Sequence, residues 1–195
     1  MKKKNLRLRS MIAIAMLSSI SFVLMLFNFP LPPFPAFLQV DFSEVPAIIA
    51  AITMGPVAGI LVELLKNVLD WLFSGSPTGV PVGHMANFAT GVLFILPVWW
   101  VYHRLSTAKG MTTGLILGTL SMAVGMSLLN YVLFLPLYVK FMNFPVMSGE
   151  ELYQMIVLGI LPFNLLKGII LAAIILLLFR SMHRWIEKQR AVFLG

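Results

Sequence analysis

Residues 152–179 read LYQMIVLGILPFNLLKGIILAAIILLLF, an almost unbroken apolar run of 28 residues. A helix needs about 20 apolar residues to cross the hydrocarbon core of a bilayer, so this stretch predicts a transmembrane helix. Two polar side chains lie deep inside it, Asn164 and Lys167, which are three residues apart and therefore on roughly the same helix face. Because an ammonium inside hydrocarbon costs at least about 2.5 kcal/mol, we expect this pair to serve a binding site or a buried ion pair.

The whole chain has the composition of a membrane protein. Of its 195 residues, 59% are hydrophobic and 11% are charged, and the mean hydropathy is +0.95. These values lie far from those of soluble globular domains. We therefore expect an all-α integral protein of the cell membrane that forms a single domain over residues 1–195. With no cysteine and three histidines, the sequence gives no support for a metal centre or for thiol chemistry.

The net charge of +7 comes from basic residues at the ends of the apolar runs. One group precedes the first run and another follows the last: Lys2, Lys3, Lys4, Arg7 and Arg9, then Arg180, Arg184, Lys188 and Arg190. Lys and Arg are enriched on the cytoplasmic side of membrane proteins, so the pattern predicts that both termini are cytoplasmic. No nucleic-acid partner is needed to explain the charge.

Six apolar segments predict six transmembrane helices in one compact bundle. They cover residues 10–29, 45–54, 56–73, 85–102, 112–139 and 152–179, and Gly55-Pro56 separates the second from the third. Residues 30–43 contain four prolines, which exclude a continuous helix and predict an ordered loop over the bundle. With six spans and cytoplasmic termini, the segments 30–43, 74–84 and 140–151 face the outside.

The third predicted helix carries a row of polar side chains at spacings of three and four, which places them on one face: Glu63, Lys66, Asn67 and Asp70. Glu63 can pair there with Lys66 or Asn67. An internal ion pair of this kind fixes helix packing, whereas a substrate-facing row would bind cargo, and the sequence leaves both open. His84 and Asn87, at the start of the fourth helix, are more typical of a polar cap than of a ligand site.

Asn130 lies beside aromatic residues in the fifth predicted helix. Tyr131, Phe134 and Tyr138 follow it on nearby turns, and Pro136 predicts a bend. An amide beside aromatic rings suits a flat heterocyclic ligand. In the alternative interpretation, Asn130 bonds a neighbouring helix and the aromatic side chains form an interfacial belt.

Asn164 and Lys167 also allow two interpretations. A polar heterocycle with carbonyl and imide groups could accept from the ammonium and pair with the amides, while apolar walls bury its rings. Alternatively, Lys167 pairs with Glu63 or Asp70 inside the bundle.

Several catalytic signatures are missing from the sequence. It contains no G-x-x-x-x-G-K-[ST] phosphate loop, no H-E-x-x-H and no G-x-S-x-G, which predicts a non-enzyme without its own ATPase site. If the protein uses energy, a partner would then have to supply it. Ala15 and Ser19, four residues apart, give the first predicted helix a small-residue face on which another helix can approach closely.

Two stretches carry a family resemblance. VDFSEVPAIIAAITMGPVAGILVELLKN, residues 40–67, and LPFNLLKG, residues 161–168, resemble the riboflavin-specific S components of energy-coupling factor (ECF) transporters. The resemblance implies a six-helix protein that binds the vitamin near its extracellular side and works with a transmembrane T component and two cytoplasmic ATPases. It also implies that Ala15 and Ser19 form the family's A-x-x-x-A contact with the T component, although Ser19 departs from alanine.

The same resemblance assigns the ligand contacts. Asn130, Asn164 and Lys167 fall at the positions of the family's flavin-binding polar residues, with the loop PAFLQVDFSE, residues 35–44, as a lid. Five further candidates come from this loop: Phe37, Leu38, Val40, Phe42 and Glu44. Whether FMN is accepted besides riboflavin stays open.

Two other functions remain open at this level. The chain could be an S component for another vitamin, such as thiamine, biotin or a pterin, because one scaffold can carry different pockets. It could also be a small stand-alone permease that works as a homo-oligomer, with Glu63, Lys66 and Asp70 coupling transport to protons.

Overall fold

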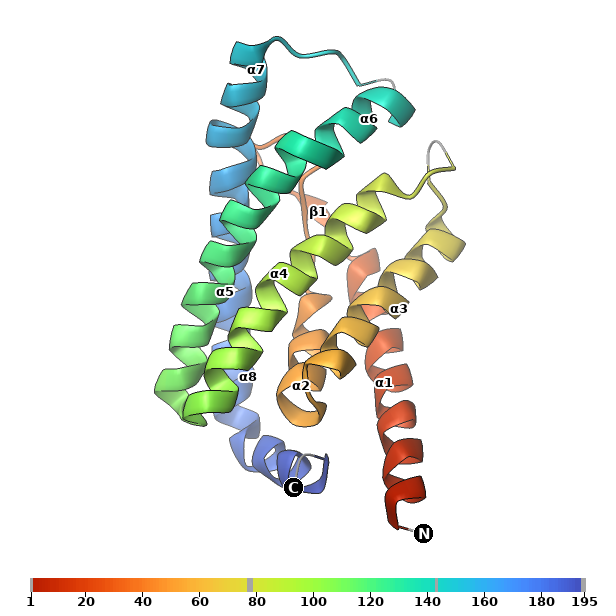
Figure 1. The fold of residues 1–195 in the computed structure, drawn as a ribbon, viewed down its shortest axis with the longest axis vertical. Coiled ribbons are helices and arrows are strands. Elements are labelled where there is room, and N and C mark those ends of the chain that lie inside the picture. Colours follow the sequence, from red (N-terminus) through yellow and green to blue (C-terminus); the bar gives the residue numbers. More distant parts are fainter. Residues whose placement is uncertain (1, 77–78, 143, 194–195) are drawn as a thin grey trace.

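The chain forms a bundle of long helices with both termini at the same end (Figure 1). The computed structural model describes residues 2–76, 79–142 and 144–193. The turn between α4 and α5 lies at the end that carries the termini, and the segment that follows α1 lies at the other end (Figure 1). The prediction of an all-α protein is confirmed, apart from two strands of two residues each.

The first half of the chain contains three helices and an irregular segment, which we call the 27–43 loop. The helices are α1 (Lys2–Leu26), α2 (Glu44–Met54) and α3 (Pro56–Ser74). Within the 27–43 loop, β1 (Phe29–Pro30) pairs with β2 (Gln39–Val40) in antiparallel register. This loop contains no helix among its described residues, as its prolines predict.

Gly55 separates α2 from α3, as the sequence predicts. Its φ of 102° is open to glycine and strained for other residues, and Pro56 then occupies the first turn of α3, where a proline is tolerated. The chain therefore reverses direction between the two helices, which pack against each other (Figure 1).

The second half contains two long helical rods after α4 (Val82–Leu105). The first rod runs through α5 (Ala108–Leu129), the π-helical turn η1 (Asn130–Phe134) and α6 (Leu135–Met142). The second runs through α7 (Gly149–Gln154), the π-helical turn η2 (Met155–Ile160) and α8 (Leu161–Phe193).

Each π turn comes just before a proline, Pro136 in one rod and Pro162 in the other. A proline cannot donate to the helical ladder, and its ring crowds the carbonyl four residues earlier. The wider i→i+5 turn relieves that crowding. Where the sequence predicts a bend at Pro136, the structure has the π turn Asn130–Phe134.

Within the part of the chain that the structure describes, four helical segments are long and apolar enough to cross a membrane: Leu6–Leu26, Val82–Leu105, Ala108–Phe141 and Gly149–Phe193. Each of the six predicted segments forms a helix, although the first ends at Leu26 and not at residue 29. Neither α3 nor α2, which has 11 residues, is among the four. At about 1.5 Å per residue α2 reaches roughly 16 Å, about half of a 30 Å hydrocarbon core.

Close helix contacts hold the bundle together. A Cβ at Gly59 would come 2.7 Å from the Ala51 Cβ, so α3 lies directly on α2. A Cβ at Gly118 would come 2.7 Å from the backbone oxygen of Phe94, so α5 lies directly on α4. Small residues permit this kind of backbone approach in membrane proteins.

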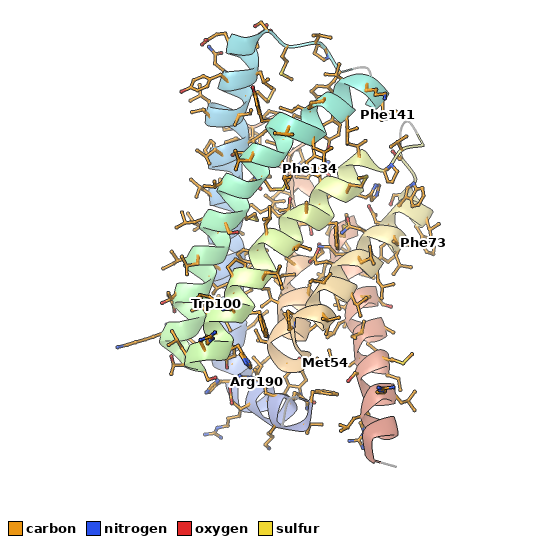
Figure 2. All side chains as sticks on the ribbon, viewed as in Figure 1. Met54, Phe73, Trp100, Phe134, Phe141 and Arg190 are labelled. Carbon is orange, nitrogen blue, oxygen red and sulfur yellow. The ribbon has the colours of Figure 1, made fainter. Side chains whose placement is uncertain are left out.

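Large apolar side chains cover the outside of the bundle (Figure 2). Phe73 and Trp100, for example, are 76% and 55% exposed. At the end that carries the termini, Tyr102 donates to Glu187 Oε1 at 2.8 Å, which docks the last turns of α8 on α4. An apolar exterior with polar contacts at the end of the bundle is what a surrounding bilayer requires.

Candidate functional site

A cavity of about 280 Å³ lies in the half of the bundle that is remote from the termini. Its wall comes from the end of α1, the 27–43 loop, the end of α3, the start of α4 and the two long rods. Among the described residues, α2 contributes none to the lining. The cavity is therefore located beyond the N-terminal end of α2.

The 27–43 loop forms one wall of the cavity. Phe37 and Leu38 line it, and the Phe37 ring packs 5.6 Å from the ring of Tyr138 and 5.5 Å from that of Phe144. Val40 and Phe42, the other two apolar candidates from this loop, are not among the lining residues.

Val40 and Phe42 instead belong to the support of the loop. Val40 is fully buried in the short β-ladder, opposite Phe29. The Phe42 ring lies 6.3 Å from the Phe29 ring. Both side chains thus hold the shape of the loop behind the cavity wall.

Asn130 and Asn164 line the cavity from the two rods. In each, Nδ2 donates to the carbonyl four residues earlier, at 2.8 Å: Asn130 to Met126 and Asn164 to Ile160. Each amide nitrogen keeps a second N–H, so each side chain can donate through Nδ2 and accept through Oδ1 when a molecule is bound.

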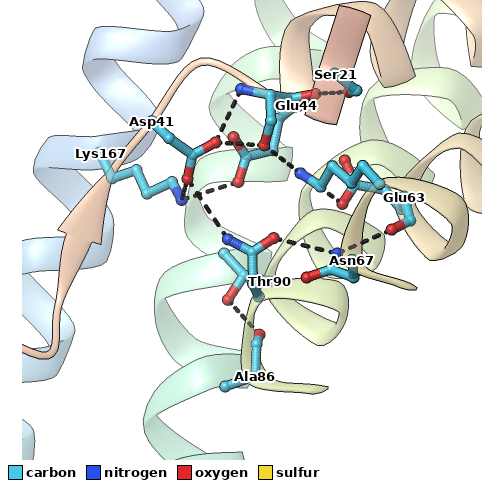
Figure 3. Close-up of polar contacts among 11 residues, drawn as sticks. Ser21, Asp41, Glu44, Glu63, Asn67, Ala86, Thr90 and Lys167 are labelled. Atoms are coloured by element: carbon cyan, nitrogen blue, oxygen red, sulfur yellow. Dashed lines mark hydrogen bonds and ion pairs between the residues drawn. The ribbon is translucent and has the colours of Figure 1, made fainter. Parts of the chain in front are cut away.

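Lys167 lines the same cavity but is not free. Its ammonium lies 2.8 Å from Glu44 Oε1 and 3.4 Å from Asp41 Oδ2, and all three side chains are almost completely buried (Figure 3). The alternative pairing of Lys167 with Glu63 or Asp70 is wrong, because the first turn of α2 and the 27–43 loop lie closer to the ammonium than α3 does. Glu44 binds Lys167 without lining the cavity.

Glu63 and Lys66 form the internal ion pair that their spacing predicts, with 2.9 Å between Oε2 and Nζ. Both are fully buried, and neither lines the cavity. Lys66 also donates to Ser43 Oγ. A substrate-facing role for this pair would therefore require a rearrangement of α3.

Asp70, at the other end of the predicted row, does line the cavity. Its Oδ2 lies 3.0 Å from His84 Nε2, and its Oδ1 accepts from Ser74 at 2.8 Å. His84 and Asn87 line the cavity as well. The sequence pattern favours a polar cap for these two residues, whereas the structure places them in the cavity wall.

Asp41 is the important residue that the sequence pattern does not single out as a ligand contact. It lines the cavity, and its Oδ2 also accepts from Asn87 at 3.5 Å. Burial alone would raise the pKa of Asp41, but the ammonium groups of Lys167 and Lys66 and the hydrogen bonds from Ser43 lower it to about 2. The wall therefore carries a fixed negative charge beside the Lys167 ammonium. A lone carboxylate in an otherwise apolar loop is the signal that could have indicated this role.

Ala15 and Ser19 lie elsewhere, on an exposed face of α1. The Ser19 hydroxyl donates to the Ala15 carbonyl at 3.0 Å, within the helix itself. At these two positions the helix thus presents small groups outward, between the exposed side chains of Ile12, Met16 and Val23. Small groups allow another helix to approach closely.

Comparison with known proteins places this geometry in a family. The family model for "ECF transporter, substrate-specific component" matches residues 9–179. The chain belongs to the S components of ECF transporters. The resemblance carried by residues 40–67 and 161–168 is confirmed at this level.

Relatives of this S component cover nearly its whole length. Riboflavin transporter FmnP of Bacillus subtilis (strain 168) is 50% identical over 186 residues, which make up 95% of this chain and 98% of that protein. Riboflavin transporter RibU of Staphylococcus aureus (strain TCH60) is 42% identical over 180 residues, covering 92% of this chain and 93% of that protein.

A solved structure described as "Structure and mechanism of the S component of a bacterial ECF transporter" has the same fold. It superposes with a TM-score of 0.78 at 41% sequence identity, covering 92% of this chain and 98% of that chain. The arrangement of helices around the cavity is therefore that of an S component.

Proposed function

We propose that this S component binds riboflavin in the cavity beside the 27–43 loop. The observation that carries the proposal is the convergence of Asn130, Asn164 and Lys167, from two different rods, on one cavity of about 280 Å³. This volume is near the lower end of the range for small-molecule sites, about 300–1,000 Å³. The proposal is further supported by relatives named riboflavin transporters at 50% and 42% identity.

The chemistry of the lining suits a flavin. An isoalloxazine ring system is flat and apolar on its faces and carries carbonyl and imide groups on one edge. Phe37, Leu38 and Phe163 offer apolar contacts to the faces. The two asparagine oxygens can accept from N–H or hydroxyl groups, and the Lys167 ammonium can donate to a carbonyl.

Transport follows from the family context. We infer that the cavity takes its ligand from outside the cell membrane, with both termini cytoplasmic. A T component and two ATPases would supply the energy, because the sequence contains no phosphate loop. Ala15 and Ser19 would form the contact with the T component through their small-residue face.

Purification in mild detergent tests the ligand. We expect the protein to carry a yellow chromophore with flavin absorption, and to quench flavin fluorescence after the ligand has been removed and added back. A protein that neither carries nor quenches flavin would refute the proposal. A competition panel of FMN, thiamine, biotin and a pterin then distinguishes riboflavin from other cargoes.

Uptake assays test the partners. With the T component and ATPases co-expressed, riboflavin uptake should require ATP hydrolysis. Uptake that persists without ATPase subunits and collapses with an ionophore would indicate a stand-alone ion-coupled permease instead.

A further inference from the structure

Ser43, at the end of the 27–43 loop, connects two helices, α1 and α3, to the cavity wall. Its hydroxyl accepts from Lys66 of α3 and donates to Asp41, and its backbone oxygen accepts from Ser21 of α1 (Figure 3). All four of these side chains are almost fully buried. In the membrane interior such polar groups are costly unless each has a partner, so their mutual bonds hold the loop in one position.

The two oxygens of Asp41 have different contacts. Oδ1 accepts from the Ser43 hydroxyl and from the Ser43 backbone N–H, the latter at 2.9 Å. Oδ2 faces Lys167 at 3.4 Å and Asn87 at 3.5 Å on the cavity side. A change in the position of Ser43 therefore shifts the Asp41 carboxylate, and with it the Lys167 ammonium that we propose as a ligand contact.

Lys66 is the far end of this connection. It does not line the cavity, and its side chain is completely buried. Its position is fixed by Glu63, whose carboxylate lies 2.9 Å away. Glu63 in turn lies against α4, because a Cβ placed on Gly91 would come 2.3 Å from Glu63 Oε2. The lysine is thus held between α3 and α4 and donates to the loop, and the Glu44 carboxylate of α2 also lies near its ammonium.

We propose that Lys66 is a positioning residue of the binding site: through Ser43 and Asp41 it holds the loop wall and orients the Lys167 ammonium, without touching the ligand. The choice of riboflavin as the probe ligand rests on the proposed function. The relay itself rests on the contacts described above and can be tested without ligand.

Riboflavin affinity of four purified variants tests the relay in the presence of ligand: Lys66→Met, Ser43→Ala, Asp41→Asn and the double variant Lys66→Met/Asp41→Asn. We expect each single variant to bind about tenfold more weakly. The double variant should bind no more weakly than the weaker-binding of the two single variants. The losses in binding free energy are not additive when one residue acts through the other. Lys109→Met is the matched control, because Lys109 is exposed and lies far from Ser43 and Asp41 in the fold. This variant should bind like the wild type.

The Lys66→Met substitution leaves Glu63 as an unpaired buried charge, which destabilises the fold. A second variant separates this loss of stability from the loss of the contact with Ser43. Lys66→Met/Glu63→Gln removes both charges of the pair. If Lys66 acts through Ser43, this variant folds and still binds weakly, as Ser43→Ala does. Wild-type affinity in Lys66→Met/Glu63→Gln or Ser43→Ala, or additive losses in the double variant with Asp41→Asn, would overturn the proposal.

Hydrogen exchange of ligand-free protein gives an independent readout. Lys66→Met/Glu63→Gln and Ser43→Ala should increase deuterium uptake in residues 37–43 and leave the first turns of α5, residues 108–118, unchanged. Unchanged uptake in that segment would also overturn the proposal. If the wild type fails to bind riboflavin, the proposed function is refuted. In that case hydrogen exchange of the ligand-free protein alone tests whether Lys66 positions the loop.

Discussion

Lys167 Nζ lies 2.8 Å from Glu44 Oε1, which joins the middle of the longest helical rod to the first residue of α2. Both side chains are buried, so this contact is an ion pair inside the protein rather than at its surface. Such a pair adds little stability relative to an apolar pair, but removal of one partner leaves an uncompensated charge. The same lysine therefore serves the fold and the proposed binding site.

Lys167→Met should lower both riboflavin affinity and thermal stability. Loss of a ligand hydrogen bond from a charged group is expected to cost about 1–3 kcal/mol of binding free energy. Loss of the pairing with Glu44 should lower the melting temperature of the ligand-free protein. Fluorescence quenching and thermal unfolding in detergent measure the two effects separately.

Lys167→Met/Glu44→Gln is the control for that experiment. It removes both charges and should recover much of the lost stability while binding stays weak. Recovery of affinity together with stability would show that Lys167 acts only through the fold.

Asn164→Leu should weaken riboflavin binding with little change in stability. The substitution removes one local hydrogen bond, to the Ile160 carbonyl of the same helix. It also removes the amide oxygen and the second N–H that are available to a ligand. We expect a loss of about 0.5–1.5 kcal/mol in binding free energy, measured by titration calorimetry. The same substitution at Asn130 provides an independent second case, and unchanged affinity in both would exclude the amides from the site.

Gly118→Ala should destabilise the bundle. The added methyl group would meet the backbone oxygen of Phe94 at 2.7 Å, and a backbone atom cannot rotate away. We expect a net loss of about 1–2 kcal/mol in unfolding free energy, since overpacking outweighs the better helix propensity of alanine. The matched control is Gly149→Ala, whose methyl group meets nothing within 4 Å and should be neutral or slightly stabilising.

Ser19→Leu and Ala15→Leu should abolish co-purification with a tagged T component while riboflavin binding persists. Both positions are exposed on α1 and lie outside the cavity lining, so a bulky side chain blocks helix approach without touching the ligand site. Thr113→Leu, at an exposed position of α5, is the control and should co-purify normally. Normal co-purification of both α1 variants would place the contact elsewhere.

Acid should loosen the first turn of α7. Hydrogen bonds from the Ser148 backbone and side chain lower the pKa of Glu151, which completes a capping box. A carboxylate with a lowered pKa in the folded state contributes stability above its ordinary pKa, and that contribution disappears as the pH falls through the lowered value. Hydrogen exchange of residues 148–154 should therefore rise in acid relative to the intrinsic rate. In Glu151→Gln this acid-dependent rise should be absent, and an equal rise in both proteins would contradict the assignment.

Hydrophobic length and the prolines are enough to predict the succession of helices and the loop at residues 30–43. They also indicate that Asn130, Asn164 and Lys167 have a special role, because each is a polar group inside an apolar run. These features depend on the local sequence and on the cost of polar groups in hydrocarbon.

The partners of Lys167 could not be predicted in this way. Its contacts with Asp41 and Glu44 depend on how the 27–43 loop folds back between α1 and α8, which is a matter of tertiary packing. Helical periodicity shows only which residues of one helix share a face. It identifies Asp70 as a residue on the polar face of its helix and therefore as a candidate partner, but it gives no information about the loop residue Asp41. For the same reason His84 could be predicted at a helix start but not on a cavity wall.

The shortness of α2 determines the depth at which cargo can be held. Because this 11-residue helix begins only at Glu44, the space that further turns at its N-terminal end would fill is left to the loop and the cavity. A bound molecule thus substitutes for missing protein volume and completes the interior of the bundle. Redesign of cargo choice should therefore begin with the loop that roofs this gap, while the six-helix frame is left untouched.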